Sequence, residues 1–179
     1  MASRVRHIER LTPPDFDSAA VIRVLHGRGV RFVLIGGIAG NLLGSTTFTH
    51  DLDICYARDA ENLDALATAL RDLEASLRGV DPGLPFKLDA RTLRNGLNFT
   101  FNTRLGPFDC LGEAGGGFTY ANLQPNAETV PLAEMTVEVA SLDDLIRMKR
   151  ATGRARDMAE VENLSALRDV RGGRLQEPW

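Results

Sequence analysis

The sequence predicts an α+β fold in which helices flank a mixed β-sheet. Three observations lead to this: an apolar run closed by glycines and followed by a short helix, a series of short strand-like segments in the middle of the chain, and amphipathic helices near both ends. At 179 residues the chain has the usual size of a single domain. We expect one domain with a core of about 15–140, C-terminal helices of about 141–169, and a loose tail at 170–179.

The first predicted elements are a helix, a strand, a second helix and a second strand. Asp15–His26 has an apolar helical face, follows two prolines and ends at glycines. Arg31–Ile35 is a buried strand closed by Gly36 and Gly37, and Ile38–Leu43 is a short helix. After a Ser/Thr-rich loop, Leu52–Tyr56 forms the second strand.

The middle of the chain begins with a helix capped by Asp59, whose leucines recur every three or four residues as far as Leu77. A loop follows at Gly79–Pro85. Three strands joined by turns are then expected beside the first two strands: Phe86–Ala90, Leu97–Asn102 and Phe108–Leu111.

The last third contains a glycine turn at 115–117 and two short strands, Val130–Leu132 and Thr136–Val139. A helix opens at Ser141 and runs to Thr152, where Gly153 stops it. A final helix of about Asp157–Asp169 should turn its apolar residues inward: Met158, Val161, Leu164 and Leu167.

Composition and charge exclude several classes of protein. The net charge of −3 argues against a protein that coats nucleic acid through a broadly basic surface. No apolar run approaches the ~20 residues of a membrane span, and no secretion signal is recognisable, so we expect a cytoplasmic protein. Cys55 and Cys110 lack the spacing of a zinc site and are expected to be small buried residues with free thiols, on opposite faces of the sheet.

Asp51 and Asp53 are the first candidates for chemistry. Two residues apart on a predicted strand, they project from the same face. Two carboxylates at such a short distance repel each other unless a cation lies between them. Oxygen ligands of this kind suit Mg²⁺ or Mn²⁺. The alternative is an exposed strand with solvated acids.

Gly36 and Gly37 are the second candidate feature. Between a buried strand and a short helix, their backbone N–H groups can bind phosphate oxygens. The alternative is a tight turn that needs glycine for its dihedral angles. Because a short helix and one loop return the chain to the Asp pair, both features can lie at the same end of neighbouring strands.

These residues resemble the DNA polymerase β-like nucleotidyltransferases. The stretches Phe32–Gly40 and Thr49–Ile54 are similar to that superfamily's glycine turn and Asp-x-Asp strand, and Asp109 matches its third acid. Further on, Asp144, Lys149 and Arg154 with Asp157 resemble a segment of the bacterial branch that includes the toxins of abortive-infection toxin–antitoxin pairs. The resemblance runs from about residue 30 to 167.

The resemblance implies a polymerase β-like fold and transfer of a nucleoside monophosphate from an NTP, with release of pyrophosphate. Asp51, Asp53 and Asp109 would bind the metal, Mg²⁺ or Mn²⁺, and act in catalysis together with Lys149. The residues expected to bind the nucleotide are Gly36, Gly37, Thr49, Lys149, Arg154 and Asp157. The implied partners are the NTP, an acceptor that is RNA (for example tRNA), protein or a small molecule, and an antitoxin protein.

Several roles have a structural alternative. Asp144 and Ser141 fit a capping box, Lys149 can reach phosphates or extend to solvent, and His50 is expected to point away from the acids. Many relatives have an arginine where this chain has Thr47. This difference favours the rival hypothesis of a silent nucleotide-binding module regulated by a partner. An unrelated α+β domain with chance motifs is the third alternative.

Overall fold

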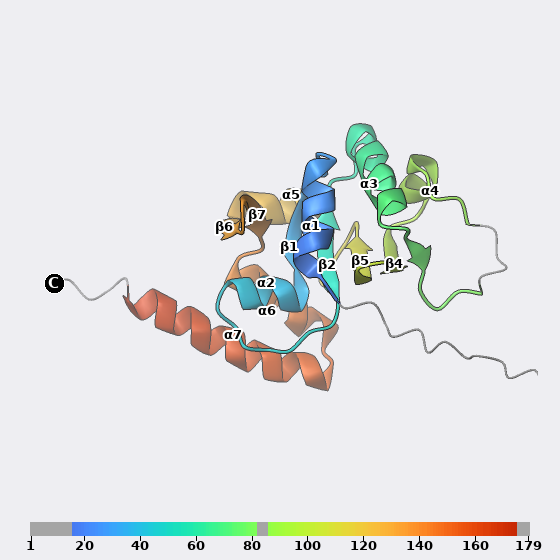
Figure 1. Cartoon of the computed structure of the whole chain (residues 1–179). Coiled ribbons are helices and arrows are strands. Elements are labelled where there is room, and N and C mark those ends of the chain that lie inside the picture. Colours follow the sequence, from blue (N-terminus) through green and yellow to red (C-terminus); the bar gives the residue numbers. More distant parts are fainter. Residues whose placement is uncertain (1–15, 82–85, 175–179) are drawn as a thin grey trace, which may run out of the picture.

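A mixed β-sheet lies at the centre of the computed structural model, which describes residues 16–81 and 86–174. Within these residues the sheet has seven strands in the order β3-β4-β5-β2-β1-β7-β6 (Figure 1). The strands are β1 Phe32–Ile35, β2 Leu52–Tyr56, β3 Ser76–Leu77, β4 Asn98–Thr103, β5 Gly106–Leu111, β6 Glu128–Leu132 and β7 Met135–Val139. β2 pairs with β5, and β1 with β7, in parallel, while the other neighbours are antiparallel. The predicted α+β class is confirmed.

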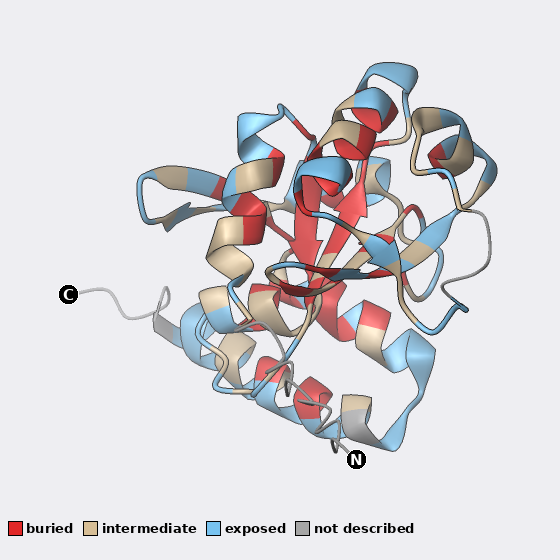
Figure 2. Cartoon of the chain, turned by 45° about the vertical axis from the view of Figure 1, so that its right-hand side comes forward, coloured by how far each residue is buried: buried red, intermediate tan, exposed pale blue. Residues whose placement is uncertain are grey.

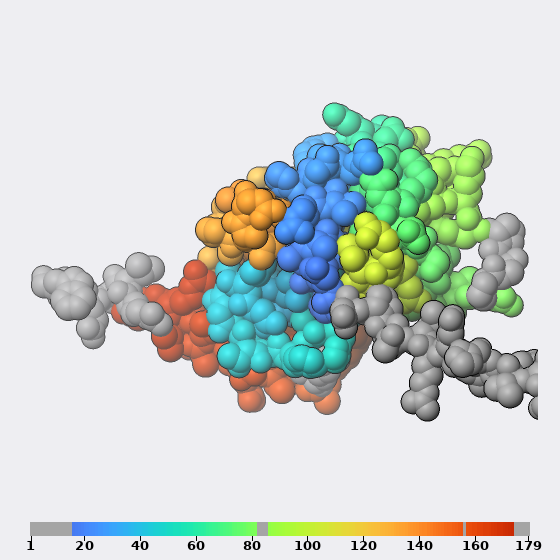
Figure 3. Space-filling model, viewed as in Figure 1, coloured from blue at the N-terminus to red at the C-terminus, as the bar shows by residue number. Residues whose placement is uncertain are grey.

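Helices surround this sheet on both sides. They are α1 Ser18–Gly27, α2 Gly36–Leu42, α3 Ala60–Asp72, α4 Ala90–Asn95, α5 Tyr120–Leu123, α6 Leu142–Thr152 and α7 Ala155–Arg174, with a 3₁₀ turn at Gln124–Asn126. α1 packs beside α3, whereas α6 contacts α2 and α7. The space-filling view shows α7, in orange and red, passing beneath α2 and extending beyond it (Figure 3).

The central strands form where continuous apolar runs allow burial on both faces. All four residues of β1 are buried, as are four of the five residues of β2. The exception in β2 is Asp53, which is half-buried. One hydrophobic cluster extends from α1 to α7 and includes the middle strands (Figure 2). The acid at position 53 therefore lies on a strand that the core fixes on both sides.

The region between α3 and β4 differs from expectation. α3 ends at Asp72 because the chain turns at Glu74, whose φ is +53°, and Leu77 lies in β3 instead of the helix. The strand predicted at Phe86–Ala90 is wrong. The Asp89 side chain accepts a hydrogen bond from the Thr92 N–H, which caps α4 and turns Leu93 into the core.

The C-terminal part also departs from the prediction. α7 continues to Arg174, so 170–174 is helical rather than a loose tail, and 175–179 lie outside the described residues. Val161 and Leu164 are buried as predicted, but Met158 is 47% exposed and its inward placement was wrong. The short helix α5 was not predicted. It rests on a capping box between Thr119 and Asn122.

No helix in residues 16–81 or 86–174 combines the length and the apolar character needed to cross a membrane.

Candidate active site

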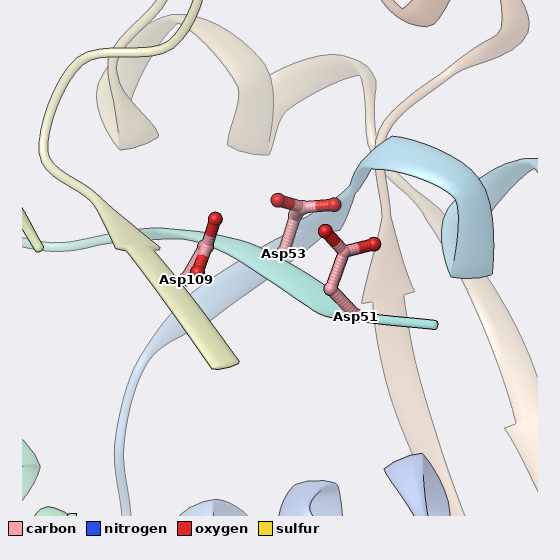
Figure 4. A group of neighbouring side chains, drawn as sticks. All are labelled: Asp51, Asp53 and Asp109. Carbon is pink, nitrogen blue, oxygen red and sulfur yellow. The ribbon is translucent and has the colours of Figure 1, made fainter. Parts of the chain in front are cut away.

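Three aspartates converge at one end of the central strands. In the sheet register Asp53 lies opposite Ile35 on β1 and opposite Asp109 on β5, and Asp51 comes directly before β2. One carboxylate oxygen from each acid lies within 4.8 Å of the others. Figure 4 shows the three side chains on the same side of the sheet. The convergence that strand parity predicted for Asp51 and Asp53, and that the resemblance implied for Asp109, is confirmed.

The glycine turn allows this close approach. At Gly36, where φ is +68°, an added Cβ would lie 2.1 Å from Asp53 Oδ2. At Gly37 an added Cβ would lie 2.6 Å from the Cβ of Thr49. The two glycines therefore leave space for the acid and for the loop that leads to it. They also open α2, where the first backbone N–H groups of a helix have no acceptor within it.

The crowding of carboxylates changes their acidity. Burial first, and then the negative charges of Asp51 and Asp109, raise the pKa of Asp53 to about 7, while the positive charges of Lys149 and Arg78 act in the opposite direction. Burial also raises the pKa of Asp109, although the Arg78 guanidinium acts against this shift. A site that resists ionisation in this way favours a bound cation.

Two neighbouring side chains hold the outer acids. Thr49 Oγ1 donates a 2.8 Å hydrogen bond to Asp51 Oδ1, so the structure places Thr49 against the metal-ligand candidate Asp51. Arg78, which the sequence analysis did not single out, forms a 2.5 Å ion pair with Asp109 Oδ1. It lies between the predicted helix, which was expected to reach Leu77, and the predicted loop at Gly79–Pro85, and no sequence pattern marked it.

Lys149 forms an ion pair with Glu160 of α7. Their side chains are 16% and 10% exposed, so Lys149 does not simply extend to solvent. It also lines the cleft that contains Asp53 and opposes the raised pKa of that acid. Glu160 was missed by the sequence analysis. Its sequence signal is its place one residue before Val161 and four before Leu164, on the buried side of the last helix.

A cleft of about 400 Å³ lies over Asp53 and Asp109. Its walls include Gly36 and Lys149, together with Arg154 and Asp157 at the junction of α6 and α7. Asp157 Oδ2 accepts a 2.5 Å hydrogen bond from Thr152 Oγ1, and Arg154 is exposed. The structure therefore brings most of the predicted nucleotide-binding residues to one cleft, and their roles stay a prediction.

Other candidates have structural roles. Asp144 is buried, and Ser141 Oγ caps the helix by accepting from the Asp144 N–H and donating to its carboxylate. His50 is exposed and contacts the Phe48 ring edge-on, 4.4 Å between centroids. Both agree with the non-catalytic alternatives.

The two cysteines are free and buried. Cys55 pairs in register with Leu111, and Cys110 with Ile54, so their side chains point to opposite faces of the sheet. This confirms the predicted arrangement.

No family model and no curated protein matches the sequence. In structure the chain is similar to the lincosamide antibiotic adenylyltransferase LnuA, solved with lincomycin bound: the TM-score is 0.58 at 12% identity, over 86% of this chain and 99% of that chain. It is also similar to the antibiotic-resistance factor ANT(2'')-Ia, with a TM-score of 0.51 at 16% identity, over 88% of this chain and 92% of that chain. A crystal structure of ANT(2'')-Ia with adenylyl-2''-tobramycin gives the same score and identity. These likenesses establish the nucleotidyltransferase fold.

Proposed function

We propose that this protein is a metal-dependent nucleotidyltransferase, which moves a nucleoside monophosphate from an NTP to a hydroxyl acceptor and releases pyrophosphate. The observation that carries the proposal is the convergence of three carboxylates within 4.8 Å beside a glycine turn that their packing requires. Asp53, Asp109 and Gly36 of this arrangement line a cleft in a nucleotidyltransferase fold.

The donor set fits Mg²⁺ or Mn²⁺. Asp51, Asp53 and Asp109 offer carboxylate oxygens alone, which hard divalent cations prefer, and the repulsion among them is relieved by a cation. When bound, the metal would neutralise phosphate charge and polarise the reacting phosphoryl group.

The remaining roles follow from the positions of side chains in the cleft. Gly36 and Gly37 present backbone N–H groups to the phosphates, and Lys149 supplies positive charge for the leaving pyrophosphate. Asp109, on the far side of Asp53 from the glycine turn, orients the acceptor hydroxyl and takes its proton. Arg154 and Asp157 lie on the wall of the cleft, where they can contact the nucleotide.

We propose that the protein acts in the cytoplasm as the toxin of a toxin–antitoxin pair and that an antitoxin protein regulates it. This rests on the segment Asp144 to Asp157, which is similar to that of the toxin branch. The antibiotic ligands of the two structural neighbours make a small-molecule acceptor the competing choice. A cleft of about 400 Å³ is within the size range of small-ligand sites.

The test is incubation of the protein with each NTP labelled at the α-phosphate, with Mg²⁺ and a cell extract, followed by locating the label. Label on RNA or protein would support the toxin setting, and label on a small molecule would support the competing acceptor. Asp53→Asn should abolish transfer, while Asp143→Asn is the matched control, because Asp143 pairs with Arg168 on the surface away from the acids.

The rival function is a nucleotide-binding module without turnover, which Thr47 favours. Calorimetric titration with a non-hydrolysable ATP analogue separates the two. Both hypotheses predict affinity that requires Mg²⁺ and that Asp53→Asn removes. Binding of this kind without label transfer to any acceptor would favour the silent module, and equal affinity with and without a chelator would contradict the metal site itself.

A further inference from the structure

Arg78 reaches the acids from the edge of the sheet. It directly follows β3, and its N–H donates to the carbonyl of Thr100 on β4. Thr100 in turn lies opposite Asp109 on β5. Arg78, Thr100 and Asp109 therefore form a row from the residue after β3 across β4 to β5, and the arginine side chain spans β4 to reach the carboxylate.

The three acids differ in the side chains that they contact. Among the described residues, Asp109 is the one member of the triad that forms an ion pair, and its partner is Arg78. The hydrogen-bond partner of Asp51 is the neutral hydroxyl of Thr49, and Asp53 packs against Gly36. The Asp109 side chain is 15% exposed, so the guanidinium supplies charge where water contributes little.

We propose that Arg78 is an internal counter-ion, which occupies Asp109 until a divalent cation takes its place. Asp109 is then the last of the three acids to become available, after Asp51 and Asp53. This inference rests on the proposed metal site. It assigns to Arg78 a role in setting the affinity and the order of metal occupancy, which the motif residues alone do not specify.

The physical basis is competition between two cations for one carboxylate. A guanidinium held on Asp109 offsets one of three negative charges and stabilises the site while it holds no metal. The same positive charge repels an incoming dication, so its removal should tighten metal binding by on the order of tenfold. A merely structural arginine would lower stability without tightening metal binding.

The experiment is a Mn²⁺ titration of the full chain at pH 8, followed by electron paramagnetic resonance of free Mn²⁺. Arg78→Met keeps the aliphatic stem and removes the charge. The matched control is Arg104→Met, because Arg104 lies between β4 and β5 and donates to the Asp72 carbonyl, away from the acids. We expect Arg78→Met to bind Mn²⁺ about tenfold more tightly than wild type, and the control to bind it like wild type.

Thermal melts provide a second readout. In EDTA, Arg78→Met should melt below wild type, and Mn²⁺ should raise its melting temperature by more than it raises that of wild type. If this variant does not fold without metal, Arg78→Gln, which keeps donor groups but not the charge, should show the same tighter binding. An affinity equal to or weaker than that of wild type would overturn the inference. A wild-type protein that binds no Mn²⁺ would instead overturn the proposed metal site.

Discussion

Loss of Lys149 should destabilise the fold as well as the reaction. On sequence alone Lys149→Met is a mild change, because methionine keeps the apolar stem and helix propensity. In the structure Lys149 pairs with Glu160, and both side chains are largely buried. Removal of one partner from a buried pair costs about 3–5 kcal/mol, because the other charge stays buried without compensation. Since both groups keep some contact with water, we expect about 3 kcal/mol.

Thermal and denaturant unfolding measure this cost. For a chain of this size, about 3 kcal/mol corresponds to a fall in melting temperature of roughly 6–12 °C. The double variant Lys149→Met with Glu160→Met removes both charges and should recover most of the loss. The matched control is the exposed pair of Arg23 and Glu134, whose side chains are 53% and 66% exposed. Arg23→Met should cost less than about 1 kcal/mol.

The double variant separates stability from catalysis. If Lys149 stabilises charge that develops on the leaving pyrophosphate, label transfer should fall about a hundredfold to a thousandfold in the single and in the stable double variant. A Lys149→Met protein that melts like Arg23→Met would refute the buried-pair reasoning. A double variant that transfers label at the wild-type rate would remove Lys149 from the reaction.

Three further predictions concern the ionisation of Asp53, the glycine turn and the two cysteines. The pKa of Asp53 is raised from 3.8 to about 7, so the folded, metal-free protein holds this proton more tightly than the unfolded chain does. Its contribution to stability should be complete below pH 4 and should be lost as pH rises through 7. Melts in EDTA should show that Asp53→Asn removes this pH dependence. Gly36→Ala should abolish Mg²⁺-dependent NTP binding in calorimetry and destabilise more than Gly29→Ala, which has a similar φ of +69° but open space around it. Mass spectrometry of the non-reduced protein should find free thiols at Cys55 and Cys110, and a linked peptide pair would contradict the strand register.

The sequence predicts the centre of the fold well, because β1 is a continuous apolar run and β2 is apolar except for Asp53, and both lie between clear turn signals. The segment at Phe86–Ala90 alternates apolar and polar residues as a strand does. It leads into α4 instead, because the Asp89 side chain accepts a hydrogen bond from the Thr92 N–H and so caps that helix. The early end of α3 depends on a positive φ at Glu74. Local pattern does not report such a conformation at a residue other than glycine.

Within the site, the predictable part is local in sequence. Strand parity places Asp51 and Asp53 together, and the glycine turn at the start of the preceding helix is recognisable without a structure. Arg78 and Glu160 could not be assigned in the same way. Arg78 contacts an acid 31 residues away, and Glu160 contacts a lysine 11 residues away on another helix. Those pairings depend on the edge strand and on the packing of α7, which only the complete fold defines.

Thr47 lies close to the Lys149–Glu160 ion pair. It lines a small pocket of about 10 Å³, between the glycine turn and α7, together with Lys149 and Glu160. An arginine side chain at position 47 is much larger than this free volume, so it would have to point away from the ion pair or displace it. An arginine at position 47 that entered the pocket would compete with Lys149 for Glu160. The threonine and the Lys149–Glu160 pair thus belong to one arrangement, in which Glu160 of α7 holds the Lys149 ammonium beside the glycine turn, where we propose that the phosphates bind.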